Sequence, residues 1–309
     1  MQGIKPGNIL LFTAIVFFSG VSPALAQELE PRKYTNLPVG VNFVGAGYAY
    51  TAGGILFDPS IPLDNANIKT HGAVLAYVRS IKIGGMSGRV NMILPYAWLS
   101  GSADYEGQRV SRDVSGLGDP RLGLTVNFIG APALSLSEYR SYSQDLIFGG
   151  SFHVYMPLSQ YDPEKLVNIG TNRFTFKPEL GISKAFGRFS LELITGISFF
   201  TVNNDFYGGK TRSQAPITSL QGHAVYSFKG GIWAAFDATF YWGGRTTVDG
   251  VSGQDLQQNS RFGLTLALPV SMRHTIKIYA SSGVLTRTGT DFDVFGLLWQ
   301  YRWGKGFPK

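Results

Sequence analysis

The chain has 309 residues, no cysteine and a formal net charge of +7, and only 15% of its residues are charged. A soluble globular domain usually carries about 25% charged residues. The low charge, the 39 glycines and the 14% aromatic content therefore argue against an ordinary soluble α/β enzyme. The absence of cysteine excludes disulfides, thiol nucleophiles and cysteine-ligated zinc.

The N-terminus has the features of a secretory signal peptide. Lys5 supplies a positive charge, residues 9–18 form an apolar run, and residues 24–26 (Ala-Leu-Ala) have the small-x-small pattern that precedes cleavage. The run is too short to cross about 30 Å of hydrocarbon as a helix. We expect residues 1–26 to be removed after Ala26 and residues 27–309 to form a single domain.

The rest of the chain alternates between turn-rich segments and segments with apolar residues at every second position. We read twelve strand-like segments, and ten of them, in chain order, are 39–50, 69–83, 89–98, 121–128, 146–156, 174–182, 189–199, 232–242, 261–270 and 295–303. Alternation over about ten residues is typical of membrane strands that face lipid on one side and a lumen on the other. The pattern predicts an all-β fold, an antiparallel transmembrane β-barrel of about twelve strands in the bacterial outer membrane.

The connections between these segments alternate in length. Short turns alternate with long polar segments at 51–66, 99–117, 157–171, 202–216, 243–258 and, shorter, 285–292. Outer-membrane barrels have short periplasmic turns and longer extracellular loops. Residues 130–144 form a long connection where a short turn is expected, and the pattern leaves open whether they fold inward as a plug.

The last strand-like segment has Phe295, Leu297, Trp299, Tyr301 and Trp303 at alternate positions. It resembles the C-terminal signal of outer-membrane barrels, although residues 304–309 follow the last aromatic residue. The resemblance implies that the outer-membrane assembly machinery, membrane lipid and lipopolysaccharide are partners of this chain.

Charged residues and histidines on the polar strand faces are the candidate lumen lining. They are Lys69, Arg79, Arg89, Arg121, His153, Lys177, Glu179, Glu192, His223, Asp237, Arg261 and Lys277. Because bases outnumber acids in this set, one interpretation is a narrow, mildly cationic pore. The other, given equal weight, is a charge network that bridges and plugs the barrel.

The sequence offers little sign of catalysis, and we predict no enzyme activity, cofactor or metal site. Ser151 and His153 share a strand face, but it is the polar one, so such a pair would not reach a lipid acyl chain outside the barrel. The loop carboxylates lack EF-hand spacing. Lysines and arginines are scattered rather than clustered, so nucleic acid is not expected as a partner. A lipid-acting hydrolase stays open as an alternative if a histidine and a serine meet on the outer face near the long loops.

Several strings are similar to a known family. They are SGLGDPRL at 115–122, GAPAL at 130–134, SQYDPEKL at 159–166, GTNR at 170–173, FKPELG at 176–181, GRTT at 244–247 and QYRW at 300–303. These strings resemble the outer-membrane transporter family named for the MetA pathway of phenol degradation.

The resemblance implies a barrel that passes or binds small molecules, hydrophobic or aromatic ones among them, and it carries no catalytic residues. The leading hypothesis is therefore a passive outer-membrane channel or binder. The alternatives are the hydrolase and a structural barrel with a plugged lumen.

Overall fold

The computed structural model describes residues 29–56, 63–105, 108–287 and 289–307. The predicted signal peptide lies outside the described residues. No helix in the described part of the chain is both long and apolar enough to cross a membrane.

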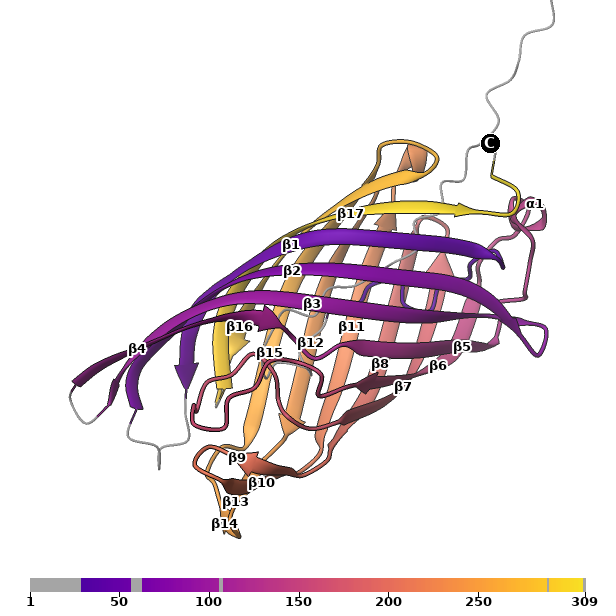
Figure 1. Cartoon of the computed structure of the whole chain (residues 1–309). Coiled ribbons are helices and arrows are strands. Elements are labelled where there is room, and N and C mark those ends of the chain that lie inside the picture. Colours follow the sequence, from indigo (N-terminus) through magenta and orange to yellow (C-terminus); the bar gives the residue numbers. More distant parts are fainter. Residues whose placement is uncertain (1–28, 57–62, 106–107, 288, 308–309) are drawn as a thin grey trace, which may run out of the picture.

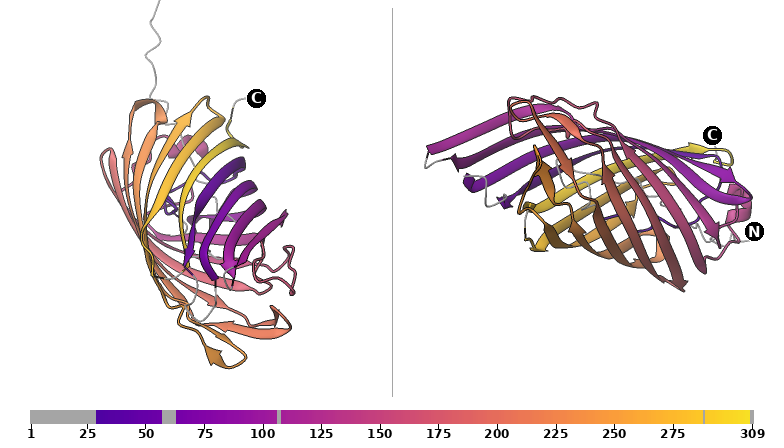
Figure 2. Two further views of the ribbon diagram at one scale, coloured as in Figure 1. Left: turned by 90° about the vertical axis from the view of Figure 1, so that its left-hand side faces the viewer. Right: turned by 90° about the horizontal axis from the view of Figure 1, so that it is seen from below.

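The dominant element is one closed antiparallel sheet (Figures 1 and 2). Its strands are β1 (Val41–Leu56), β2 (Leu63–Ile83), β3 (Met86–Tyr105), β4 (Gln108–Leu117), β5 (Arg121–Ile129), β6 (Leu146–Tyr155), β7 (Thr175–Phe186), β8 (Phe189–Phe200), β11 (Ile217–Ser227), β12 (Trp233–Gly243), β15 (Gln257–Pro269), β16 (His274–Leu285) and β17 (Gly289–Gly304). Each strand pairs with its neighbours, and β1 pairs with β17, which closes the barrel.

Strands β4 and β5 share one position in the barrel. Both pair with β3: β4 along Tyr96–Tyr105 and β5 along Gly88–Ile93. The closed barrel therefore has 12 strand positions, which confirms the predicted fold class.

The outer face of the barrel is apolar because alternate strand residues point outward. On β8, Leu191 and Leu193 are 52% and 50% exposed, whereas Glu192 between them is 4% exposed. Aromatic clusters follow the same face, among them Tyr226 with Phe189 and Phe228, and Trp299 with Tyr301. Apolar residues flanked by aromatic ones are typical of a lipid-facing surface.

One end of the barrel, here the short-turn end, carries the tight connections. Gly84 and Gly85 join β2 to β3 with φ values of 55° and 87°, a backbone conformation that favours glycine. The 3-10 turn η1 (Lys229–Gly231) joins β11 to β12. Barrel topology in outer membranes places this end in the periplasm.

The long connection at 130–144 also lies at the short-turn end, beside β5 and β6 (Figure 1). It carries the helix α1 (Leu136–Tyr139). The Val39 N–H donates to the Leu134 carbonyl at 2.8 Å, and the Tyr139 hydroxyl donates to the Asn36 carbonyl at 3.1 Å. These bonds hold the connection against the residues that precede β1.

The opposite end, here the long-loop end, carries a second, smaller sheet. Its strands are β9 (Asn203–Phe206), β10 (Lys210–Gln214), β13 (Thr246–Val248) and β14 (Val251–Ser252), in the order β14-β13-β10-β9. Residues 156–174, between β6 and β7, form a loop at the same end (Figure 1).

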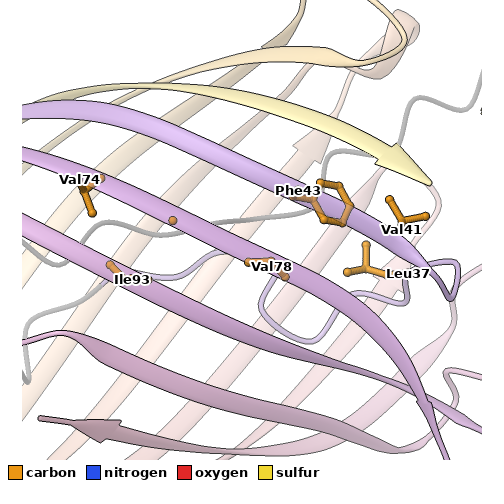
Figure 3. Close-up of a cluster of buried hydrophobic side chains, with 7 residues drawn as sticks. Leu37, Val41, Phe43, Val74, Val78 and Ile93 are labelled. Atoms are coloured by element: carbon orange, nitrogen blue, oxygen red, sulfur yellow. The ribbon is translucent and has the colours of Figure 1, made fainter.

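Residues 29–40, the N-terminal segment, fold into the barrel lumen. Tyr34 is fully buried and lies so close to Gly181 that a Cβ there would be 2.0 Å from its ring. Figure 3 shows Leu37 packed in an apolar cluster with Phe43, Val78 and other side chains of β1 to β3. The segment therefore fills part of the lumen. The ring of Tyr34 packs tightly against β7, and Leu37 packs in the apolar cluster.

Candidate functional site in the barrel lumen

The centre of the site is an ion network around Lys33 of the N-terminal segment. The Lys33 ammonium contacts the carboxylates of Glu30 and Glu179, and Lys177 Nζ lies 3.0 Å from Glu179 Oε1. All four side chains are at most 4% exposed. Buried charges are tolerated when they are paired and hydrogen-bonded, and this arrangement meets that condition.

Further bonds join the segment to the barrel wall. Arg121 Nη1 lies 3.2 Å from Glu30 Oε1, the Arg32 N–H donates to Glu192 Oε2 at 2.6 Å, and Arg89 donates to the Lys33 carbonyl. These partners come from β3, β5 and β8, so the segment is held from several sides of the lumen.

Glu30, His153 and Glu179 have a geometry that could hold a metal ion, because one ligand atom of each lies within 4.8 Å of the others. However, the Lys33 ammonium contacts both Glu30 and Glu179. The side chain of Lys33 therefore supplies the positive charge that these carboxylates require, and the cluster functions as an internal ion network.

A second polar group lies on β11, β12 and β15. His223 Nδ1 is 2.7 Å from Asp237 Oδ1, and the Thr265 hydroxyl donates to Asp237 Oδ2 at 2.9 Å. Two basic side chains lie near the buried Trp233 ring: Arg32 Cζ at 5.4 Å from its centroid and Lys277 Nζ at 5.8 Å. Cations over an aromatic face are favourable, more so when desolvated.

Most of the predicted lumen residues are buried. Those at most 7% exposed are Arg89, Arg121, His153, Lys177, Glu179, Glu192, His223, Asp237, Arg261 and Lys277. The prediction is wrong for Lys69 and Arg79, which are exposed, whereas the intervening Thr70 and Val78 are buried.

The inversion on β2 has two physical causes. Its inward face carries Val74, Ala76 and Val78, which pack in the apolar cluster with Leu37 of the N-terminal segment. Lys69 and Arg79 lie towards opposite ends of the 21-residue strand, where long basic side chains can extend to the membrane–water interface. The predicted alternation on β2 is correct, but its inner and outer faces are the reverse of the prediction.

The residues that sequence analysis missed are those of the N-terminal segment, chiefly Glu30, Arg32, Lys33 and Tyr34. The signal was present as a charge-dense run, Glu-Leu-Glu-Pro-Arg-Lys-Tyr at 28–34, immediately after the predicted cleavage point. A run of this polarity is typical of an exposed tail. Only the tertiary structure shows that carboxylates and cations of the barrel wall pair with its charged residues.

The histidines bear on the hydrolase alternative. His153 and His223 are buried in the lumen, and Ser151 and His153 both contact Glu179. His71 is exposed on the outer face, and its ring is hydrogen-bonded to the Tyr48 hydroxyl rather than to a serine. This partner does not supply the histidine–serine pair that the alternative requires.

Comparison with one solved structure, the first of the three that follow, supports the fold. The COG4313 outer membrane channel from Pseudomonas putida F1 superposes with a TM-score of 0.74 at 16% identity, covering 88% of this chain and 99% of that one. The β domain of the Bordetella autotransporter BrkA gives 0.49 at 11% identity, covering 85% and 99%. The KdgM porin gives 0.45 at 10% identity, covering 83% and 98%.

No curated protein matches the sequence. The sequence profile of the family described as "Putative MetA-pathway of phenol degradation" matches residues 49–292. That match covers most of the barrel, which itself has the fold of an outer membrane channel. The chain therefore belongs to this family of bacterial outer-membrane β-barrels.

Proposed function

We propose that this protein is a passive channel for small molecules across the outer membrane, with a lumen narrowed by its own N-terminal segment. The observation that carries the proposal is a closed barrel with an apolar outer face and a polar, charged interior that holds residues 29–40. A polar interior lets water and polar solutes approach, and the segment restricts passage to small ones.

The lumen also places aromatic rings beside basic side chains. Arg32 Cζ lies 5.4 Å and Lys277 Nζ 5.8 Å from the Trp233 ring centroid, and Arg121 Cζ lies 5.8 Å from the Tyr155 ring centroid. Trp233 and Tyr155 are at most 1% exposed, so these rings belong to the packed wall and not to an open path. The family match is therefore what supports hydrophobic or aromatic solutes among the small molecules that the channel passes.

Planar-bilayer recording with the mature protein, combined with liposome swelling in a series of small solutes, tests the proposal. We expect discrete conductance steps and swelling that falls sharply with solute size. Heat-denatured protein is the control. A folded barrel that gives neither conductance nor swelling would contradict the channel.

The second candidate is a structural barrel that the N-terminal segment keeps plugged. The specific observation in its favour is the ion pairing of Glu30 and Lys33 with buried wall residues. In that case the folded protein would give neither conductance steps in the bilayer nor swelling of the liposomes. We also propose that the protein is not an enzyme, and phospholipid incubated with it should release no fatty acid.

The lipid-facing surface requires insertion into the outer membrane. We propose that the assembly machinery recognises the alternating aromatic residues of β17, and that lipopolysaccharide surrounds the exposed rim of the barrel.

A further inference from the structure

The lumen mouth at the long-loop end holds a buried arginine with unused donors. Arg173 is 7% exposed, and its guanidinium packs on Phe200, which continues the inward-facing set of β8 after Ile194 and Ser198, so its side chain is on the lumen side of the wall. Its Nη2 donates to Gln214 Oε1, and its Cζ is 4.4 Å from the Phe200 ring centroid. Nε and Nη1 have no hydrogen-bond partner among the described residues.

Buried polar groups in native proteins are nearly always hydrogen-bonded, so an exception calls for an explanation. A buried guanidinium with unused N–H groups is especially unfavourable because it carries a charge. An anion bound at Arg173 would supply the hydrogen-bond acceptors that the protein does not provide for Nε and Nη1.

A second cation lies beside it. Arg212 is on β10, two residues before Gln214, so both side chains are on the same face of that strand. The Arg212 Cζ is 5.0 Å from the Phe206 ring centroid. Burial and, next, the charge of Arg212 lower the pKa of Arg173 to about 9, which leaves its guanidinium protonated at neutral pH.

The neighbouring carboxylates are bonded to other groups. Asp119 accepts from the Ser159 hydroxyl at 2.5 Å and from the Thr171 hydroxyl at 2.7 Å, and Asp255 accepts from the Thr246 hydroxyl at 2.6 Å. In the part of the chain that the structure describes, no ion pair joins Arg173 or Arg212 to an acid.

We propose that Arg173 and Arg212 form a binding site for a small organic acid at the long-loop mouth. The carboxylate lies against the two guanidinium groups, and the apolar body of the ligand lies towards the rings of Phe200 and Phe206. A carboxylate is the natural partner of a desolvated guanidinium because it accepts several N–H bonds and neutralises the charge. Binding of a ligand at this site does not require permeation, so this proposal can be tested independently of the proposed channel.

The test is saturation binding of benzoate to the mature barrel in detergent, followed by ligand-observed NMR. We expect Arg173→Gln and Arg212→Gln each to weaken binding about tenfold or more, as loss of a charged hydrogen bond predicts. Arg173→Lys keeps the charge but loses the planar contact with Phe200, so its affinity should be intermediate. Each variant is first shown to be folded by its heat-modifiable mobility in gel electrophoresis.

Arg109→Gln is the matched control, because Arg109 is a long-loop-end arginine whose side chain is 57% exposed and paired with Asp104. Its benzoate affinity should equal that of the wild type. Benzamide, which is neutral, and inorganic phosphate, which has no apolar body, should each compete at least about tenfold more weakly than benzoate.

The proposal is overturned if wild-type protein shows no saturable benzoate binding, if the folded Arg173→Gln and Arg212→Gln variants bind as well as wild type, or if benzamide or phosphate competes equally. If Arg173→Gln does not fold, Arg212→Gln decides the question. Because binding is read without a membrane, a silent channel would leave this result unaffected.

Discussion

The middle of the lumen and its long-loop mouth are both rich in buried charges, but the charges are used differently. In the middle, Lys33 contacts Glu30 and Glu179, and Lys177 pairs with the same Glu179. At the mouth, Arg173 keeps two nitrogen atoms without a partner among the described residues. In the middle, cations and carboxylates form ion pairs that stabilise the structure. At the mouth, among the described residues, no acid forms an ion pair with Arg173 or Arg212, so their guanidinium groups can bind an anion. If ion pairs hold the middle of the lumen together, removing one there should have a larger effect than a substitution at either end of the barrel.

The largest expected effect is that of Lys33→Met. It leaves the carboxylates of Glu30 and Glu179 without their shared cation, and breaking a buried ion pair typically costs about 3–5 kcal/mol. We expect the N-terminal segment to leave the lumen, which should raise single-channel conductance and expose residues 29–40 to protease. Lys82→Met, at an exposed position near the β2–β3 turn, is the control. Unchanged conductance together with full protease protection would refute the role of Lys33.

Gly181→Ala tests how the N-terminal segment is held in the lumen without changing any charge. An added Cβ would lie 2.0 Å from the Tyr34 ring, so Tyr34 must shift. Overpacking of this kind typically costs about 1–3 kcal/mol. We expect faster proteolysis of the N-terminal segment. Gly222→Ala is the matched control, because a Cβ at Gly222 meets no atom within 4 Å. Equal proteolysis rates for the two variants would show that Tyr34 does not hold the segment.

Asp119→Ala tests how the wall is joined to the loop between β6 and β7. Asp119 accepts from the Thr171 N–H at 3.0 Å and from the hydroxyls of Ser159 and Thr171. Losing these bonds should destabilise the loop locally by about 1–2 kcal/mol, since the site is only partly buried. Hydrogen exchange over residues 156–174 should rise about tenfold. Glu164→Ala, exposed in the same loop, should leave the exchange unchanged.

The smallest effect is at the short-turn end and depends on pH. Hydrogen bonds from the Ser135 hydroxyl and backbone N–H lower the pKa of Glu138 below 4.5. A depressed carboxyl pKa stabilises the fold above the unfolded-state value and loses that contribution as the pH falls through the folded-state value. The protection factor for hydrogen exchange at α1, taken relative to the intrinsic exchange rate at each pH, should therefore fall below about pH 4.5, and Glu138→Gln should remove this pH dependence. A variant that keeps the wild-type pH profile would contradict the assignment.

The strand content of the barrel was predictable because side chains in a strand alternate strictly between two faces. On β8 and β17, where one alternate set is strongly apolar, that rule also identified the lipid side correctly, as the exposure of Leu193 and Leu297 shows. On β2 both alternate sets of residues contain polar and apolar side chains. Which set faces the lumen depends on packing against Leu37, which lies more than thirty residues away from Val74 in the sequence.

The sequence by itself determined the fold class, the outer-membrane location and the pattern of short turns and long loops. These features follow from local periodicity and from the requirement that a spanning strand bond its whole backbone. Only the tertiary structure showed that residues 29–40 fill the lumen, that the 130–144 connection docks at the barrel end, and that Arg173 lies beside Arg212. Those features depend on contacts between residues that are distant in the sequence. Whether a buried charge finds a partner depends on these contacts, and a local sequence pattern does not determine them.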